Sequence, residues 1–349
     1  PPFAGRAQVN ILVLGTDVNF VDKGIPRSDT IKLASIDVRK RTIAILSIPR
    51  DTWVAIPGHG YGKINSIFQR GGDTEQARID ATRTFLSGFL AEVSGQPVPI
   101  DYYVRMQTGG FKRIVDAMGG VVIDVEKQMD YDDNYQNLYI HLKPGRQRLN
   151  GTQAMGYVRF RHDFEGDYGR MRRQDQFIRA LAAQVNTPEM ARRLPQLLGP
   201  IMEMMVTNLS LNDLKAIKRI AGEVGMEGLH TVQLPTEPDT VGAASVVQIN
   251  DPDAARLAVA EVLNGPRTTV VVLNGTGKRR VGQQVRDALD ENVYNVLGVG
   301  TLPEPVPTTA VITKPRYDEQ AQQLAAQLGV ATIDTASAPP ADASFGRRT

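Results

Sequence analysis

Hydrophobic residues near the N-terminus fall into short runs that end in glycine or in charged residues. Three of them, at 10–15, 30–37 and 42–51, read "NILVLG", "TIKLASID" and "TIAILSIPRD". Runs of this length with turn residues on both sides are typical of buried strands. The charged segment "VRKR" between the second and third runs predicts a tight turn, and therefore an antiparallel hairpin.

This strand order has a consequence for three charged residues. If the second strand runs against both of its neighbours, then the end of the first strand, the start of the second and the end of the third lie at the same edge of the sheet. Asp17, Asp29 and Arg50 occupy these three positions. We therefore expect their side chains to lie close together.

Farther along the chain, helical and strand patterns alternate. Apolar residues recur at helical spacing in 73–93, 170–185, 189–206, 211–224 and 252–263, and strands are expected at 100–106, 121–126 and 230–235. The polar, turn-rich segment 129–151 predicts a small hairpin. This alternation predicts an α/β fold, in which a mixed central β-sheet carries helices on both faces as a three-layer αβα arrangement.

The segment "NGPR" at 264–267 marks a domain boundary, because glycine and proline interrupt both helix and strand. Residues 10–264 are expected to form the larger domain, and residues 268–334 a smaller C-terminal α/β domain. The tail 335–349 is rich in Ala, Ser and Pro and is expected to be disordered. Residues 1–9 are expected to be a linker behind a missing membrane anchor, since the chain contains no apolar run of about 18 residues.

Composition narrows the possible chemistry. The chain has 349 residues, 42% of them hydrophobic, and a formal net charge of +2. Such a balance fits a globular protein, and together with the absence of a helix-turn-helix pattern it argues against nucleic-acid binding. There is no cysteine, which excludes disulfides, thiolate nucleophiles and cysteine metal sites.

The segment "YVRFRHDFEGDYGRMRRQDQ" at 157–176 contains five arginines. If 157–161 is extended after a short helix that begins near Asn150, Arg159 and Arg161 project from one face. From Arg170 onward, helical spacing places Arg170, Arg173 and Gln174 at the start of a stripe that continues with apolar residues. Arg172 lies on the opposite side of that helix.

Two interpretations of these arginines are open. They can form solvated salt bridges with the nearby acids Asp163, Glu165 and Asp167. Alternatively, because guanidinium groups match phosphate oxygens in pairs, four arginines beside an apolar wall suit a pyrophosphate attached to a hydrophobic chain. The second interpretation predicts that sheet and helices enclose an apolar lipid pocket.

The carboxylates at the sheet edge suggest a metal. Asp17 and Asp29 are hard oxygen ligands, and Mg²⁺ is usually held by one or two carboxylates while substrate phosphates and waters complete its coordination. Arg27 and Arg50 flank them. The alternative is local: an Asx-turn at Asp17 and a loop-to-strand hydrogen bond at Asp29.

Several blocks together resemble the catalytic domain of the LytR-CpsA-Psr family. They occur from about 10 to 185 in the family's order and approximate spacing: "NILVLGTD", "PRSDTIKLASID", "LSIPRDTWVAIPGHGYGKIN", "IDYYVRM", "GFKRIVDAMGGVVIDV", "GRQRLNGTQAMGYVRFR" and "GDYGRMRRQDQ". The later segment 268–334, which opens "TTVVVLNGTGKRRVG", resembles the LytR C-terminal domain that often follows the catalytic domain.

The resemblance implies an Mg²⁺-dependent phosphotransferase at the extracytoplasmic face of a bacterial membrane. Such enzymes attach a glycopolymer (teichoic acid, capsule or another wall polysaccharide) from an undecaprenyl pyrophosphate carrier to peptidoglycan. The family's metal-associated aspartates correspond to Asp17 and Asp29. Its pyrophosphate-binding set corresponds to Arg27, Arg50, Arg159, Arg161, Arg170, Arg173 and Gln174, with Asp167 beside them.

We expect Asp29, Arg50 and Asp167 to take part in the reaction, with Asp167 or Asp29 as the base for the acceptor hydroxyl. Lys63 and Asn65 lie in the family's "KIN" block, without a firm role. One departure concerns the arginine that many members carry two residues after the first aspartate: Val18 and Asn19 stand there instead. Phosphate neutralisation would then depend more on Arg27 and Arg50.

Two other functions are compatible with the same residues. The first is a pyrophosphatase that cleaves prenyl diphosphates with water as the acceptor. The second is a lipid-carrier or glycan-binding protein that holds the conjugate without chemistry.

Overall fold

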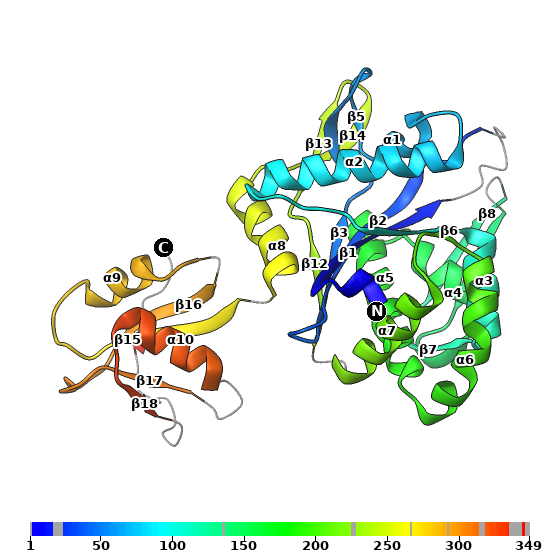
Figure 1. The fold of residues 1–349 in the computed structure, drawn as a ribbon. Helices are drawn as coiled ribbons and strands as arrows, with labels where there is room; N and C mark the ends of the chain where they lie inside the picture. The colour runs from blue at the N-terminus through cyan, green and yellow to red at the C-terminus, as the bar shows by residue number, and fades with distance from the viewer. Residues whose placement is uncertain are drawn as a thin grey trace. The chain divides into compact units, whose positions relative to one another are not determined.

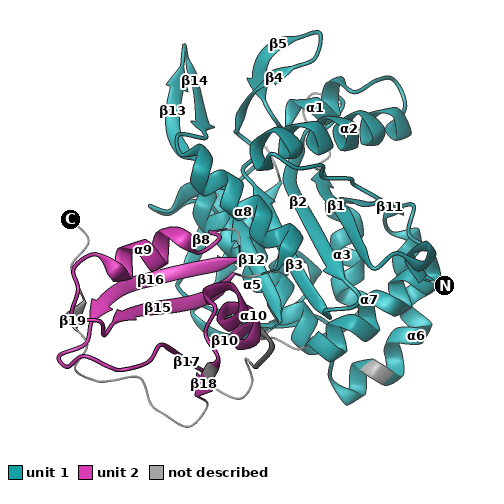
Figure 2. Cartoon of the chain, turned by 60° about the vertical axis from the view of Figure 1, so that its left-hand side comes forward, with its two compact units in different colours: residues 1–265 teal, residues 266–349 magenta. Residues whose placement is uncertain are grey.

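A computed structural model describes residues 2–16, 24–134, 137–224, 228–265, 267–291, 293–313, 318–334 and 344–345. The chain divides into two compact units, Pro1–Gly265 and Pro266–Thr349 (Figures 1 and 2). Each unit has a hydrophobic core of its own. They are therefore described separately.

A six-stranded mixed sheet forms the centre of the larger unit. Its strand order is β11-β6-β1-β2-β3-β12, where the strands are β1 (Gln8–Thr16), β2 (Ser28–Asp37), β3 (Thr42–Ile48), β6 (Tyr102–Gln107), β11 (Val206–Thr207) and β12 (Leu229–Gln233). The strand β2 is antiparallel to both β1 and β3, while β6 and β12 run parallel to β1 and β3 respectively. The predicted hairpin is thus confirmed.

Helices cover both faces of this sheet (Figure 1). Along β1, Leu12 and Leu14 pack with buried residues of α2 (Glu75–Ser94) and α8 (Pro252–Asn264), whereas Val9 and Ile11 pack on the other face with α7 (Leu211–Val224). Successive side chains of a strand point to opposite faces, so an apolar run without polar interruptions is buried on both sides. The mixed sheet between two helical layers matches the predicted fold class.

A group of small strands packs against the helices on one side of the larger unit. The ribbon β7 (Val121–Val125) and β10 (Gly145–Leu149) and the hairpin β8 (Met129–Asp133) and β9 (Leu138–Leu142) pack with α3 (Thr108–Ala117), α4 (Gly151–Arg159) and α5 (Gly166–Val185). The helix α6 (Pro188–Glu203) contributes to a separate cluster with α3. These elements include the hairpin predicted within 129–151.

Two further hairpins were not predicted. The first joins β4 (Trp53–Ile56) to β5 (Gly60–Lys63) and is followed by α1 (Ser66–Arg70); the second joins β13 (Glu237–Val241) to β14 (Ala244–Gln248). The backbone of Val247 donates a hydrogen bond to the carbonyl of Asp51 at 3.1 Å, which links the second hairpin to the first. Both project from the same side of the unit (Figure 2).

The smaller unit repeats the strand and helix alternation. Its elements are β15 (Thr268–Asn274), α9 (Val281–Ala288), β16 (Tyr294–Thr301), β17 (Ala310–Ile312), α10 (Asp318–Leu328), β18 (Thr332–Asp334) and β19 (Ser344–Phe345). Strands β15 and β16 are parallel, as are β17 and β18. Val272, Tyr294 and Leu324 belong to the core.

The two ends of the chain differ from expectation. Residues 1–9 are not a free linker: Pro2–Gly5 form a short turn whose Phe3 is 1% exposed, and β1 begins at Gln8. Phe3 packs edge-on against Tyr102, a contact that brings together residues far apart in the sequence. In the tail, Ser344–Phe345 pair with β16, while 335–343 and 346–349 lie outside the described residues.

Among the described residues, no helix has the length and hydropathy needed to cross a membrane.

Candidate active site

A cavity of about 420 Å³ lies between the central sheet and the helices α3, α4 and α5. Most of its wall is apolar and includes Phe111, Ile114, Val158, Phe177 and Leu181. Charged and polar side chains gather elsewhere on its wall: Asp29, Lys32, Arg50, Arg159, Arg161, Arg170 and Gln174. The larger unit therefore contains the apolar pocket with adjoining arginines that the sequence predicted.

Arg50 lies at the centre of the charged group. Its Nη1 is 2.9 Å from Oδ1 of Asp29, and its Nε is 3.6 Å from Oδ2 of Asp51 and 3.8 Å from Oδ1 of Asp167. Burial alone would lower the pKa of Arg50, but the three carboxylates raise it. The guanidinium is thus firmly charged at neutral pH.

The sheet register explains why Asp29 and Arg50 meet. Ile31 of β2 pairs with Ile48 of β3, so that Asp29, two positions before Ile31, and Arg50, two positions after Ile48, lie at the same edge. The structure thus brings together two of the three residues expected there. Asp17 falls within 17–23, outside the described residues.

Arg170 joins this group from the first turns of α5. Its Nη2 donates to Oδ2 of Asp167 at 2.9 Å and to the backbone oxygen of Asp29 at 3.3 Å. Burial and the nearby charge of Arg50 lower the pKa of Arg170 to about 10, so it remains charged at neutral pH. Within the described chain, the buried Nε atoms of Arg50 and Arg170 have no hydrogen-bond partner. Donors of this kind suit an anionic ligand.

Helix α5 is joined to the sheet by further polar contacts. Gln174 donates from Nε2 to Oγ1 of Thr30 at 3.2 Å. The next residue, Asp175, accepts from Nζ of Lys32 at 2.7 Å, and Lys32 also donates to Oγ of Ser47 at 2.6 Å. Burial lowers the pKa of Lys32, against the opposing effect of Asp175. These contacts fix the helix that carries Arg170 relative to the strand that carries Asp29.

The predicted extended conformation of 157–161 is wrong. Asn150 and Gln153 form a reciprocal capping box that starts α4 at Gly151, and this helix continues through Arg159. Arg159 therefore lies in the last helical turn and Arg161 lies beyond the helix end. Both nevertheless line the cavity.

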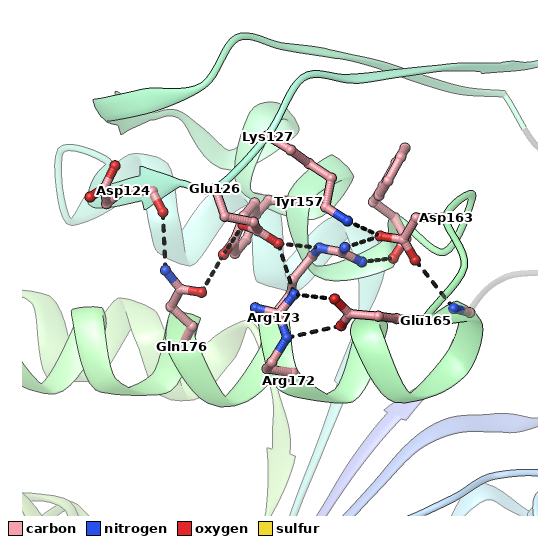
Figure 3. Close-up of polar contacts among 11 residues, drawn as sticks. Asp124, Glu126, Lys127, Tyr157, Asp163, Glu165, Arg172, Arg173 and Gln176 are labelled. Atoms are coloured by element: carbon pink, nitrogen blue, oxygen red, sulfur yellow. Dashed lines mark hydrogen bonds and ion pairs between the residues drawn. The ribbon is translucent and has the colours of Figure 1, made fainter.

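Arg173 is not part of the cavity wall, and Figure 3 shows its contacts with Glu126 and Asp163 instead. Its side chain is fully buried, with Nε 2.8 Å from Oε1 of Glu126, Nη2 bonded to Asp163 and Nη1 donating to the carbonyl of Phe160 at 2.9 Å. Glu126 follows β7 and Asp163 precedes α5, so this cluster joins the β7 end to the segment between α4 and α5. Arg173 is a structural cation of that segment.

Arg172 and Arg27 also lie outside the cavity wall. Arg172 is exposed and pairs with Glu165 at 3.0 Å and with Glu126 at 3.2 Å, which is the salt-bridge alternative considered above. Arg27 is exposed, and its Nε donates to Oε1 of Gln69 at 3.3 Å. Of the predicted pyrophosphate set, the cavity wall thus includes all members but Arg27 and Arg173.

The "KIN" block is bonded to the residues around Arg50 and Asp29. The backbone N–H of Asn65 donates to the carbonyl of Arg50, and its carbonyl accepts from the N–H of Ser28, each at 3.2 Å. Lys63 pairs with Asp51 at 2.9 Å. These contacts tie the end of β3 to the start of β2, next to Asp29.

The carboxylates present fit an Mg²⁺ ion that is shared with a substrate. Asp29 and Asp167 provide hard oxygen donors around Arg50, and one or two carboxylates are what Mg²⁺ usually takes when phosphate oxygens supply further ligands. In the described ranges, no three His, Cys, Asp or Glu side chains converge as a metal site made by protein alone.

Sequence reasoning missed several residues of this site. Asp51 was overlooked although it follows Arg50 directly. Lys32 gave a signal, because a lysine inside the apolar run "TIKLASI" must be buried and needs a partner. Its partner Asp175 and the role of Glu126 had no local signal, since each contact spans distant parts of the chain.

Comparison with known proteins identifies the family to which these residues are similar. Residues 4–261 match the model of the LytR_cpsA_psr family. Residues 267–343 match the domain described as LytR cell envelope-related transcriptional attenuator. The two matches confirm the resemblance seen in the sequence.

Two relatives illustrate the similarity. The regulatory protein MsrR of Staphylococcus aureus is 33% identical over 210 residues, which cover 60% of this chain and 58% of MsrR. The polyisoprenyl-teichoic acid--peptidoglycan teichoic acid transferase TagV of Bacillus subtilis is 29% identical over 257 residues, 71% of this chain and 61% of TagV. The matched part is thus less than two thirds of either relative.

Solved structures share the fold. The crystal structure of B. subtilis TagV has a TM-score of 0.62 at 25% identity and covers 74% of this chain and 97% of its own. TagT bound to LIIa-WTA has a TM-score of 0.57 at 22% identity, over 75% of this chain and 91% of TagT. With a family model that spans well over half of its residues, this chain belongs to the LytR_cpsA_psr family.

Proposed function

We propose that this protein is a phosphotransferase that moves a glycopolymer from a prenyl pyrophosphate carrier onto peptidoglycan. One observation supports it above all: a single cavity joins a long apolar wall to Arg50, Arg170 and their carboxylates. An apolar chain and a diphosphate on one molecule match the two parts of this cavity. The name of the relative TagV, a teichoic acid transferase, points the same way.

In this proposal the arginines bind and orient the diphosphate. Arg50 is held by three carboxylates and Arg170 by Asp167, so both guanidiniums are fixed before the substrate arrives. Groups that are already oriented stabilise developing charge without reorganisation. Arg159 and Arg161 reach the same cavity from α4 and from the residues that follow it.

Asp29 and Asp167 are the candidates for holding Mg²⁺ and for accepting the proton of the acceptor hydroxyl. Bound there, Mg²⁺ would neutralise charge on the bridging phosphate oxygens. The acceptor oxygen forms a bond to the phosphorus that carries the glycopolymer. The bond from that phosphorus to the bridging oxygen breaks, prenyl phosphate leaves and the hydroxyl proton passes to a carboxylate.

The proposal includes a location and a carrier. The substrates are an undecaprenyl pyrophosphate-linked glycan and peptidoglycan, which meet at the extracytoplasmic face of a bacterial membrane, and an anchor upstream of this chain would hold the protein there. Nucleic acid has no part in it. The apolar cavity would shield the prenyl chain from water.

A transfer assay tests this function. The protein is incubated with a lipid-linked glycan donor, uncrosslinked peptidoglycan and Mg²⁺, and the polymer is analysed for a covalent phosphodiester to the muramic acid. The proposal predicts this product and an equal amount of prenyl phosphate. Release of phosphorylated glycan into water without the phosphodiester would identify a pyrophosphatase instead, and donor binding without bond cleavage would identify a carrier.

A further inference from the structure

The hairpin β4–β5 carries two aromatic side chains, Trp53 and Tyr61, neither of which lines the cavity. Trp53 pairs with Lys63 across the strands, and Ala55 pairs with Tyr61. Residues paired in this way point to the same side of a hairpin. Tyr61 is 70% exposed, so this side faces outward.

The opposite side of the same hairpin is core. Val54 and Ile56 are 6% and 5% exposed and belong to the main hydrophobic cluster of the larger unit. The hairpin is therefore anchored by its inner side, and the outer side is held in a fixed orientation. The outer side of the hairpin therefore carries Trp53 and Tyr61, with the small Ala55 beside them.

A chain of ion pairs connects this face to the reactive group. Nζ of Lys63 is 2.9 Å from Oδ1 of Asp51, and Oδ2 of Asp51 is 3.6 Å from Nε of Arg50. The outer face thus begins beside the arginine that we place at the diphosphate. It extends away from there along the hairpin toward Tyr61.

The apolar cavity does not reach the hairpin. Residues 51–105, all of which the structure describes, contribute nothing to its wall, whereas Asp29 and Arg50 do. In phosphoryl transfer, the attacking and leaving oxygens lie roughly in line on opposite sides of the phosphorus. If prenyl phosphate leaves toward the cavity, the acceptor must approach from outside it, and the hairpin stands beside Arg50 on that outer side.

We propose that the outer face of β4–β5 binds the saccharide chain of the acceptor, an inference that rests on the transferase function above. Trp53 and Tyr61 offer apolar ring faces to the C–H faces of sugar rings, while the Tyr61 hydroxyl and the Lys63 ammonium can bond sugar oxygens. The β13–β14 hairpin is joined to the start of this hairpin by a bridge between Thr52 and Val247, and both hairpins project from the same side of the unit (Figure 2).

The chain offers a direct probe, because Trp53 is its only tryptophan. We would titrate the whole protein with a peptidoglycan tetrasaccharide of alternating N-acetylglucosamine and N-acetylmuramic acid, and follow both Trp53 emission and binding by equilibrium dialysis. Saturable binding with a change in emission is expected, and maltotetraose should not reproduce it. Tyr61→Ala should weaken binding by about tenfold, the effect of losing a central aromatic contact.

A matched control is another exposed aromatic residue. Phe164 is 94% exposed in the segment between α4 and α5, and Phe164→Ala should bind the tetrasaccharide like the unaltered protein. Absence of binding in dialysis, or equal weakening by Tyr61→Ala and Phe164→Ala, would overturn the inference.

Binding requires neither donor nor turnover, so the two proposals can fail separately. Saccharide binding without transfer would contradict only the transferase function. Transfer that proceeds equally well in Tyr61→Ala, with no saccharide bound at this face, would contradict only the acceptor site.

Discussion

Nε of Arg173 lies 2.8 Å from Oε1 of Glu126, and no part of the Arg173 side chain is exposed to solvent. The next residue toward the N-terminus, Arg172, shares the same Glu126 but is 43% exposed. Two adjacent arginines thus bind one carboxylate in very different environments (Figure 3). This pair separates the structural arginines of the segment from those that line the cavity.

Arg173→Met is therefore expected to destabilise the larger unit, because Glu126, Asp163 and the Phe160 carbonyl lose their shared donor. The expected loss is about 3 kcal/mol in the free energy of unfolding, typical of breaking a buried ion pair. Arg172→Ala is the matched control and should cost less than about 1 kcal/mol. Urea unfolding followed by Trp53 emission reports on this unit alone, and equal effects of both substitutions would contradict the assignment.

The same cluster predicts a pH dependence of stability. Burial alone would raise the pKa of both Glu126 and Asp163. Hydrogen bonds from the backbone and from Arg173 nevertheless hold the pKa of Glu126 below its usual value. Hydrogen bonds from Lys127 and Arg173 do the same for the pKa of Asp163. A carboxyl whose pKa is lowered by folding stabilises the protein above its unfolded pKa, and this contribution is lost as the pH falls through the folded pKa.

Stability should thus decrease as the pH falls below about 4.5, near the ordinary carboxyl pKa values. Arg173→Met should make this decrease shallower, because part of what lowers both pKa values is gone. The measurement is the urea midpoint between pH 7 and pH 3 for both proteins. Parallel curves would show that Arg173 does not set these pKa values.

The positions of some site residues could be predicted from the sequence, and those of others could not. The meeting of Asp29 and Arg50 followed from strand polarity alone, since antiparallel neighbours bring a strand start next to a strand end. The placement of Arg170 and Gln174 on the cavity side followed from helical spacing. Both arguments use only geometry within or between adjacent elements.

What failed depended on partners that are distant in sequence. Arg173 satisfies the same helical spacing as Arg170, but Glu126, 47 positions away, takes its charge. The burial of Phe3 depends on Tyr102 in the same way. By contrast, a helix beginning near Asn150 was predicted correctly, and only its continuation through Arg159 was missed.

The buried pair of Lys32 and Asp175 offers a second stability test. Lys32→Met or Asp175→Leu alone leaves one charge buried without its partner and should cost about 3 kcal/mol. The double substitution should recover most of that loss, because two apolar side chains of similar volume replace two desolvated charges. A double-mutant cycle by urea unfolding measures the coupling, and additive losses would indicate that the pair is not coupled.

Arg50→Lys should slow transfer by about a hundredfold or more in kcat, as the loss of an oriented charge donor does. Lysine retains the charge but cannot span three carboxylates and a phosphate as the guanidinium fork does. Arg27→Ala, whose side chain contacts Gln69 outside the cavity, is the control and should change kcat little. Equal rates for the Arg50→Lys and unaltered proteins would remove Arg50 from the reaction.

The apolar wall can be tested through chain length. Leu181 lines the cavity, and Leu181→Trp should fill part of the space that a long prenyl chain would occupy. Turnover of a donor with a long prenyl chain should fall, while a donor with a short prenyl chain should be turned over at nearly the unaltered rate. If both donors are affected equally, the cavity is not the site of the prenyl chain.

The central claim is that the cavity holds a prenyl chain while its arginines hold the diphosphate. Native mass spectrometry of the purified protein with prenyl pyrophosphate tests it most directly, by comparing the unaltered protein with the double variant Arg159→Ala, Arg161→Ala. We predict a complex with one bound lipid, and an affinity at least about tenfold lower in the variant, as expected when charge-assisted hydrogen bonds are lost. No bound lipid, or equal binding by both proteins, would contradict the claim.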